Sequence, residues 1–110
     1  MLKGKTVHIR LKRQFLEQKL WSYIGKVTAM SENWIALDAK GVFVLKGLSR
    51  PVSVDDAVRP MVLPRDSVLS VRVLPDDFSL EKVEVMYDGT KLGINVPGGP
   101  PAWIGEAGEG

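Results

Sequence analysis

The chain has 110 residues, 45% of them hydrophobic, and no cysteine, which predicts one globular domain and excludes disulfides, thiolate metal sites and cysteine nucleophiles. No segment approaches the roughly 18 consecutive apolar residues of a membrane helix, and no signal-peptide pattern follows the basic N-terminus, so we expect a cytoplasmic protein without a membrane partner. The net charge of +2 is uneven, because residues 1–65 hold 12 Lys or Arg against 5 Asp or Glu and residues 66–110 hold 3 against 8. This distribution is typical either of a body that binds an anionic partner or of ordinary clustering on a solvated surface.

The first half of the chain alternates in the manner of strands. In residues 6–12 (TVHIRLK), apolar side chains fall on one face and His8, Arg10 and Lys12 on the polar face, which predicts a half-buried strand. Residues 14–20 fit a helical turn or a long connection. Residues 21–30 predict a second strand, in which Gly25 indicates a bulge, a bend or a close backbone approach. After a polar turn at 31–33, we expect a strand over 34–37, a hairpin connection over 38–41 and a return strand over 42–45.

The second half is less regular. Residues 47–60 predict a surface loop, and short strands follow over 61–63 and 67–74. Residues 80–87 fit one more strand or a short helix. Residues 89–110 hold 7 Gly and 3 Pro, which predicts a flexible tail that buries little, except that Trp103 and Ile104 are suited to docking on the body or on a partner.

These elements predict an all-β fold: a small, strongly bent, antiparallel, five- to six-stranded SH3-like barrel with a flexible C-terminal tail. The predicted barrel spans residues 1–75. Residues 76–110 form an acidic and then Gly/Pro-rich extension.

Two short segments resemble the motifs of the Sm-like family. Residues 23–27 (YIGKV) through 34–37 (WIAL) resemble its first motif, and residues 62–71 (VLPRDSVLSV) resemble its second, with 47–60 in place of the variable loop. The resemblance covers about residues 5–75. The chain departs from the family in having Pro64-Arg65 where the second-motif turn usually has Arg then Gly, and in lacking the aspartate at the start of the first-motif loop.

The resemblance implies a ring-shaped homo-oligomer whose last two barrel strands pair edge to edge between neighbouring subunits. It also implies an RNA pocket lined by the two motif loops, which places Asn33, Trp34 and Arg65 in that pocket. Two of them have a plainer interpretation, because Trp34 opens an apolar strand and is suited to the core, and Arg65 is suited to a local pair with Asp66.

The N-terminal segment supplies cations for phosphate contacts. Lys3, Lys5, Arg10 and Lys12, followed by Arg13, precede the first acidic residue, Glu17. Such a stripe contacts phosphates without reading sequence, and an exposed Trp34 would add stacking on an unpaired base.

Residues that would carry catalysis are not apparent. His8 is the single histidine and has no evident partner as a general base or metal ligand, and Asp55-Asp56 and Asp76-Asp77 are typical of solvated turns. No Gly-rich phosphate loop or nucleophile elbow occurs. We therefore expect no enzyme activity, no metal and no cofactor.

Two functions remain from this reading. The first is an oligomeric, non-catalytic Sm-like RNA-binding protein, favoured by the basic N-terminal stripe. The second is a protein-interaction or structural module on an SH3-like barrel without nucleic acid, favoured by the irregular turn at Pro64-Arg65.

Overall fold

The fold is all-β and built from antiparallel strand pairs. The computed structural model describes residues 2–12, 21–44, 52–89 and 91–106. Within them, the larger sheet contains six strands, in the order β4-β3-β2-β1-β6 with β5 also paired to β3, and the smaller sheet has the order β7-β8-β9. The strands of the larger sheet are β1 (Thr6–Leu11), β2 (Trp21–Met30), β3 (Trp34–Val44), β4 (Val52–Val54), β5 (Arg59–Pro64) and β6 (Val68–Val73).

The larger sheet follows most of the predicted strands. β1, β2, β5 and β6 lie within a few residues of their expected positions, and the turn at 31–33 joins β2 to β3. Gly25 is a point of close backbone approach, because a Cβ at this position would overlap the Asp38 carbonyl oxygen. β2 and β3 therefore come together at Gly25 more closely than any side chain allows.

The predicted hairpin at residues 38–41 is wrong, because β3 runs through it without a turn. Ile35, Leu37 and Ala39 are buried on one face of β3, whereas Val42 and Val44 are buried on the other. The polar stretch between these sets marks the place where β3 passes from one core to the other. Polar composition alone resembled a turn there.

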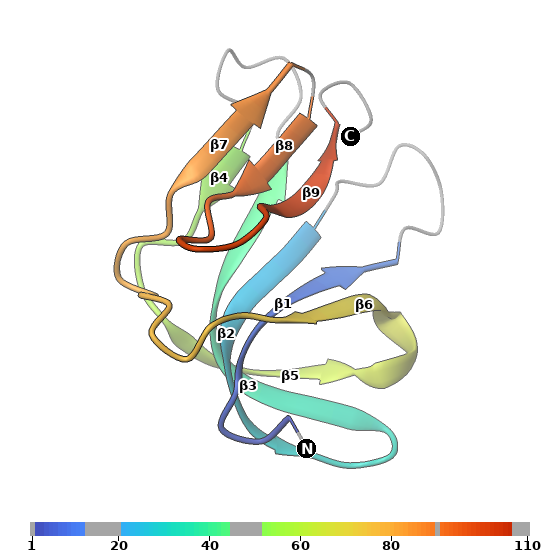
Figure 1. Ribbon diagram of the computed structural model, residues 1–110. Coiled ribbons are helices and arrows are strands. Elements are labelled where there is room, and N and C mark those ends of the chain that lie inside the picture. The colour runs from blue at the N-terminus through green and yellow to red at the C-terminus, as the bar shows by residue number, and fades with distance from the viewer. Residues whose placement is uncertain (1, 13–20, 45–51, 90, 107–110) are drawn as a thin grey trace.

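The two faces of the larger sheet belong to two cores. The inner core lies within the curl of the sheet and consists of Val7, Ile9, Val27, Ile35, Leu37, Ala39 and Leu63. The seam lies between the two sheets and consists of Ile24, Val42, Val44, Leu74, Leu92, Ile94, Val96, Ala102 and Ile104. Figure 1 shows the smaller sheet at the top, over β4 and the upper parts of β2 and β3.

The flexible tail predicted for residues 89–110 is wrong over residues 91–106. The smaller sheet consists of β7 (Val85–Asp88), β8 (Lys91–Ile94) and β9 (Ala102–Glu106), so that residues 80–87 end in a strand and form no α-helix. Glycine allows this packing, because Gly93 lies against the ring of Trp103. A Cβ on residue 93 would lie only 2.7 Å from a ring carbon of Trp103. Ile104 is buried in the seam, so it docks on the body.

The predicted barrel is not closed in the part of the chain that is described. β5 pairs with β3 and β6 pairs with β1, but β5 and β6 do not pair with each other although only the 3-10 helix η1 (Arg65–Ser67) separates them. β4, inside the predicted loop at 47–60, pairs with the far end of β3. The predictions for Arg13 and residues 14–20, and for 47–51, lie outside the described residues.

Candidate nucleic-acid interface

The two turns expected to form a pocket lie against each other. The Arg65 backbone N–H donates to the Asn33 carbonyl at 2.9 Å, and Arg65 Nη1 donates to the Ser31 carbonyl at 2.9 Å. The neighbouring strands continue this contact, because Trp34 pairs with Pro64 in the β3–β5 register. The structure thus brings Asn33, Trp34 and Arg65 together from segments about thirty residues apart. Asp66 forms no ion pair with Arg65 among the described residues.

Trp34 lies on the surface and not in the core. Its side chain is 39% exposed, and the alternation along β3 turns it away from Ile35 and the inner core. Val62 on β5 is 65% exposed and shares this outer face through its partner Ala36. The indole ring is therefore accessible to a stacking partner at the edge of the sheet.

An open depression lies beside Arg65 on the inner side of β6. It has a volume of about 300 Å³ and is lined by Leu2, Met30, Ile35, Arg65, Val68, Leu69, Ser70 and Val71. Val71 and Val73 pair with Ile9 and Val7, so they face the inner core. They are nevertheless exposed, as is Leu69. These side chains stay accessible because no described strand covers that edge of β6.

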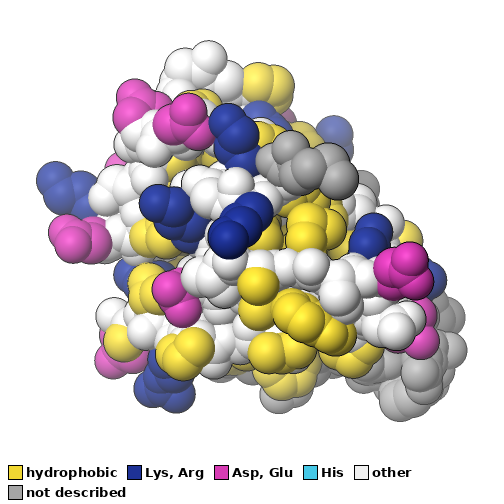
Figure 2. Space-filling view, turned by 90° about the horizontal axis from the view of Figure 1, so that it is seen from below, with side chains coloured by type: hydrophobic (Ala, Val, Ile, Leu, Met, Phe, Trp, Pro, Cys, Tyr) yellow, Lys and Arg dark blue, Asp and Glu magenta, His cyan; other side chains and the backbone are white. Residues whose placement is uncertain are grey.

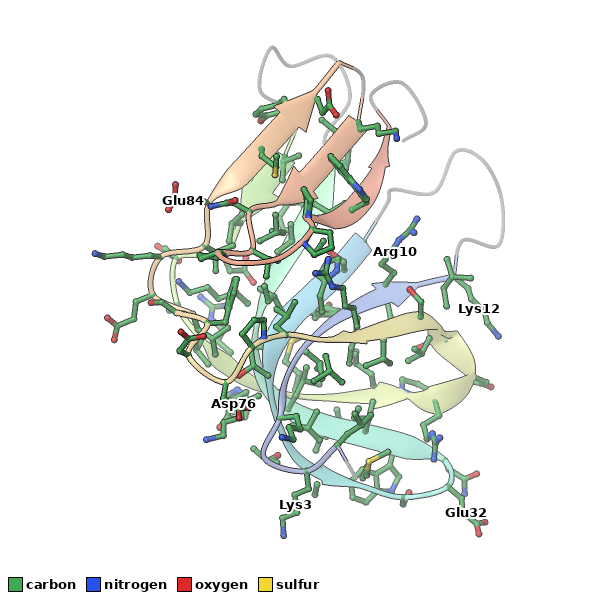
Figure 3. The ribbon with its side chains drawn as sticks, viewed as in Figure 1. Lys3, Arg10, Lys12, Glu32, Asp76 and Glu84 are labelled. Carbon is green, nitrogen blue, oxygen red and sulfur yellow. The ribbon has the colours of Figure 1, made fainter. Side chains whose placement is uncertain are left out.

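The predicted cations do not form one group. Figure 3 shows Lys3 at the lower end of the molecule, with Arg10 and Lys12 toward the other end of β1. Lys5 Nζ lies 3.7 Å from Asp76 Oδ1, and the Lys12 backbone N–H donates to the carbonyl of Ser67, the last residue of η1. Figure 2 shows hydrophobic side chains gathered at the centre of the face seen from below, with Lys and Arg spread around them. Lys3 therefore lies apart from Arg10 and Lys12, and the Lys and Arg side chains seen on this face surround an apolar area.

His8 and Arg72 form a feature that the sequence did not indicate. His8 pairs with Ile24 of the seam and is only 2% exposed, and its Nε2 atom has no hydrogen-bond partner. Burial, and then the charges of Arg10 and Arg72, lower the pKa of His8 to about 4. Arg72 pairs with His8 in register and donates to the Pro101 carbonyl. The one sequence signal was that Arg72 alternates with Val71 and Val73.

Among the described residues, no three His, Asp or Glu side chains are grouped as metal ligands, and no helix is long and apolar enough to cross a membrane. Comparisons with protein-family models, curated proteins and solved structures found no match to this chain.

Proposed function

We propose that this chain is a non-catalytic, Sm-like RNA-binding protein that assembles into a closed homo-oligomer through the edges of β5 and β6. One observation carries the proposal: two consecutive strands, joined by a three-residue 3-10 helix, lie at different edges of a curled sheet and pair with different neighbours. In the Sm-like resemblance, these are the strands that pair between subunits.

The exposed side chains support self-association at this place. Leu69 and Val73 are 55% and 48% exposed on the inner side of β6. An unpaired strand edge with apolar side chains favours association, and soluble assemblies of identical subunits tend to close. A second copy that placed its β5 along β6 would pair the free backbone N–H and C=O groups of this edge and would also cover these side chains.

The geometry of the two turns supports RNA as the ligand. Trp34 offers an exposed ring for stacking, Asn33 offers an exposed amide, and the Arg65 guanidinium, fixed by the Ser31 carbonyl, adds positive charge. Single-stranded nucleic acid is bound through base stacking on aromatic rings combined with cations along the backbone. The neighbouring Lys12 is exposed and suited to a phosphate contact.

The mass of the intact assembly, measured before and after nuclease treatment, tests this function. We expect a discrete multiple of the 12.1 kDa chain, together with nuclease-sensitive mass. A monomer at micromolar concentration would contradict the assembly. Absence of binding to single-stranded oligonucleotides at low salt would contradict the RNA ligand.

A protein-interaction module is the second candidate. It is favoured by the aromatic side chains of Trp21, Tyr23 and Phe43, which form a half-exposed group with ring centroids 5.7 Å and 6.5 Å apart. A discrete oligomer that binds no oligonucleotide would support this candidate over the first.

A further inference from the structure

The face of β1 that carries His8 also carries positive charge. Directly paired residues of neighbouring strands point to the same face of a sheet, so Arg72 on β6 lies beside His8. Arg10 lies two residues further along β1 and shares this face. Three basic side chains from two strands therefore lie together where the larger sheet meets the smaller sheet.

No described carboxylate neutralises these side chains. The Arg72 guanidinium is half-buried, and its hydrogen bond of 2.6 Å goes to the neutral carbonyl of Pro101. The single ion pair among the described residues joins Lys5 to Asp76, which involves neither arginine. A charge that loses water without gaining a counter-ion is costly, so positive potential here favours an anion from solution.

His8 is an independent sign of an unfilled polar site. Its Nε2 atom is buried and unpartnered, whereas nearly all buried polar side-chain atoms in folded proteins have a hydrogen-bond partner. In the neutral imidazole, Nε2 carries a proton in one tautomer and donates it to an acceptor. An anion near the two guanidinium groups would supply that acceptor.

A glycine in the loop above this group lies close to Arg72. Between β8 and β9, residues 97–101 read PGGPP, and Gly98 has a φ of +79°, a conformation that glycine adopts without strain. The position of a Cβ on Gly99 lies 3.7 Å from Arg72 Nη2, so a side chain there would touch the guanidinium group. Because residue 99 is glycine, no side chain from this position contacts Arg72.

We propose that this group binds a phosphate-type oxyanion, with Arg72 and Arg10 as charged donors and His8 Nε2 as a neutral donor. Guanidinium groups bind phosphate through two parallel hydrogen bonds, which are stronger than neutral ones. The anion is either free phosphate or a phosphate of a nucleic acid, since both present the same oxygens. This site does not depend on the proposed RNA-binding function.

Titration of the full chain with inorganic phosphate at pH 7, at constant ionic strength set by chloride, tests the site. We expect a saturable shift of the His8 side-chain nitrogen signals in NMR spectra and a melting temperature that rises with phosphate. Arg72→Gln should weaken phosphate binding at least tenfold, and Arg10→Gln should weaken it less. The matched control is Lys26→Gln. Ile24 on β2 pairs with His8, and Lys26 is an exposed cation two residues further along the same face of β2, so its removal should leave phosphate binding unchanged.

If Arg72→Gln fails to fold, Arg10→Gln and Arg72→Lys carry the test, because the lysine keeps the charge but loses the two parallel donors. A His8 signal that changes equally in chloride, or a phosphate affinity that none of the three substitutions alters, overturns the proposal.

A second arm with a single-stranded oligonucleotide identifies the source of the phosphate. Parallel loss of phosphate and oligonucleotide binding in Arg72→Gln supports the site as a nucleic-acid contact. Phosphate binding without oligonucleotide binding supports the site for free phosphate and overturns the proposed RNA-binding function alone.

Discussion

The inner core and the seam use opposite faces of one sheet, but they differ in chemistry and in how they are covered. The inner core is apolar and is closed by the curl of its own sheet, except along β6, where Val73 stays exposed. The seam is covered by a separate sheet, and polar side chains such as His8 and Ser22 are buried on its side of β1 and β2. A face covered by a distant segment can bury polar groups that, in sequence, look solvated.

These polar groups are treated unequally. Ser22 Oγ donates to the Val42 carbonyl at 3.0 Å, so its burial is compensated. His8 Nε2 has no such partner. Ser22 therefore stabilises the seam, whereas the burial of the neutral His8 imidazole costs free energy as long as no anion is bound.

The largest effect should come from removing one large side chain from each core. Leu37→Ala in the inner core and Ile94→Ala in the seam should each lower the free energy of unfolding by about 2–5 kcal/mol, through lost burial and the cavity that remains. Denaturation followed by circular dichroism and by amide hydrogen exchange measures both. Because the two cores share β1–β3, we expect one cooperative transition in both variants. Early exchange confined to residues 91–106 in Ile94→Ala would show instead that the smaller sheet unfolds alone.

The pH dependence of stability should distinguish the seam from the inner core. His8 has a pKa of about 4 when folded and an ordinary value of 6.5, so between these values the unfolded chain binds more protons. Its contribution is complete above pH 6.5 and is lost as pH falls toward 4, by about 3 kcal/mol at 1.36 kcal/mol per pKa unit. His8→Gln should remove this part of the slope in phosphate-free buffer. Equal slopes in both proteins would mean that His8 takes up its proton at the same pH in the folded and the unfolded state, so that its burial does not lower its pKa.

The inner-core strands could be predicted from sequence, because the alternation of apolar and polar residues there directly indicates which side chains face the core. Val7, Ile9 and Leu11 face inward as their period requires, and Gly25 marks a close approach as a glycine within a strand predicts. The meeting of Asn33 and Arg65 was expected from the Sm-like resemblance and not from the residues alone.

Apart from the docking of Ile104, which was expected on the body or on a partner, the seam could not be predicted, because its second half lies in the Gly/Pro-rich segment. Leu92, Ile94 and Ile104 are separated by glycines and prolines that lower any local strand signal, and only tertiary packing against β2 and β3 makes them a sheet. If the smaller sheet is not known, the sequence predicts His8 and Arg72 to be ordinary exposed residues of two strands. The anion-binding group depends on contacts between strands far apart in sequence.

Among the surface sites, the turn that carries Trp34 should give the larger effect on ligand binding. If Trp34 stacks on an unpaired base, Trp34→Ala should weaken oligonucleotide binding by about 1–3 kcal/mol. Trp21→Ala is a matched control, because Trp21 is similarly exposed but packs against Tyr23 and Phe43. Fluorescence anisotropy of a labelled single strand measures both. An equal loss in the two variants would locate the binding surface elsewhere.

A substitution at the open edge of β6 should have the smallest effect on folding and a clear effect on assembly. Leu69 is 55% exposed on β6, so Leu69→Lys should change the free energy of unfolding of the isolated chain by no more than about 0.5 kcal/mol, as is usual for surface substitutions. In an assembly that pairs β5 with β6, the same lysine would be placed in an apolar contact and would lose its water, which disfavours association. Tyr87→Lys is the control, because Tyr87 is an exposed apolar residue on β7, away from both edges. Sedimentation should show Leu69→Lys as a monomer and Tyr87→Lys as the original oligomer. If both variants keep the oligomer, the subunits associate through another surface, and the exposed side chains of β6 are left for a different partner.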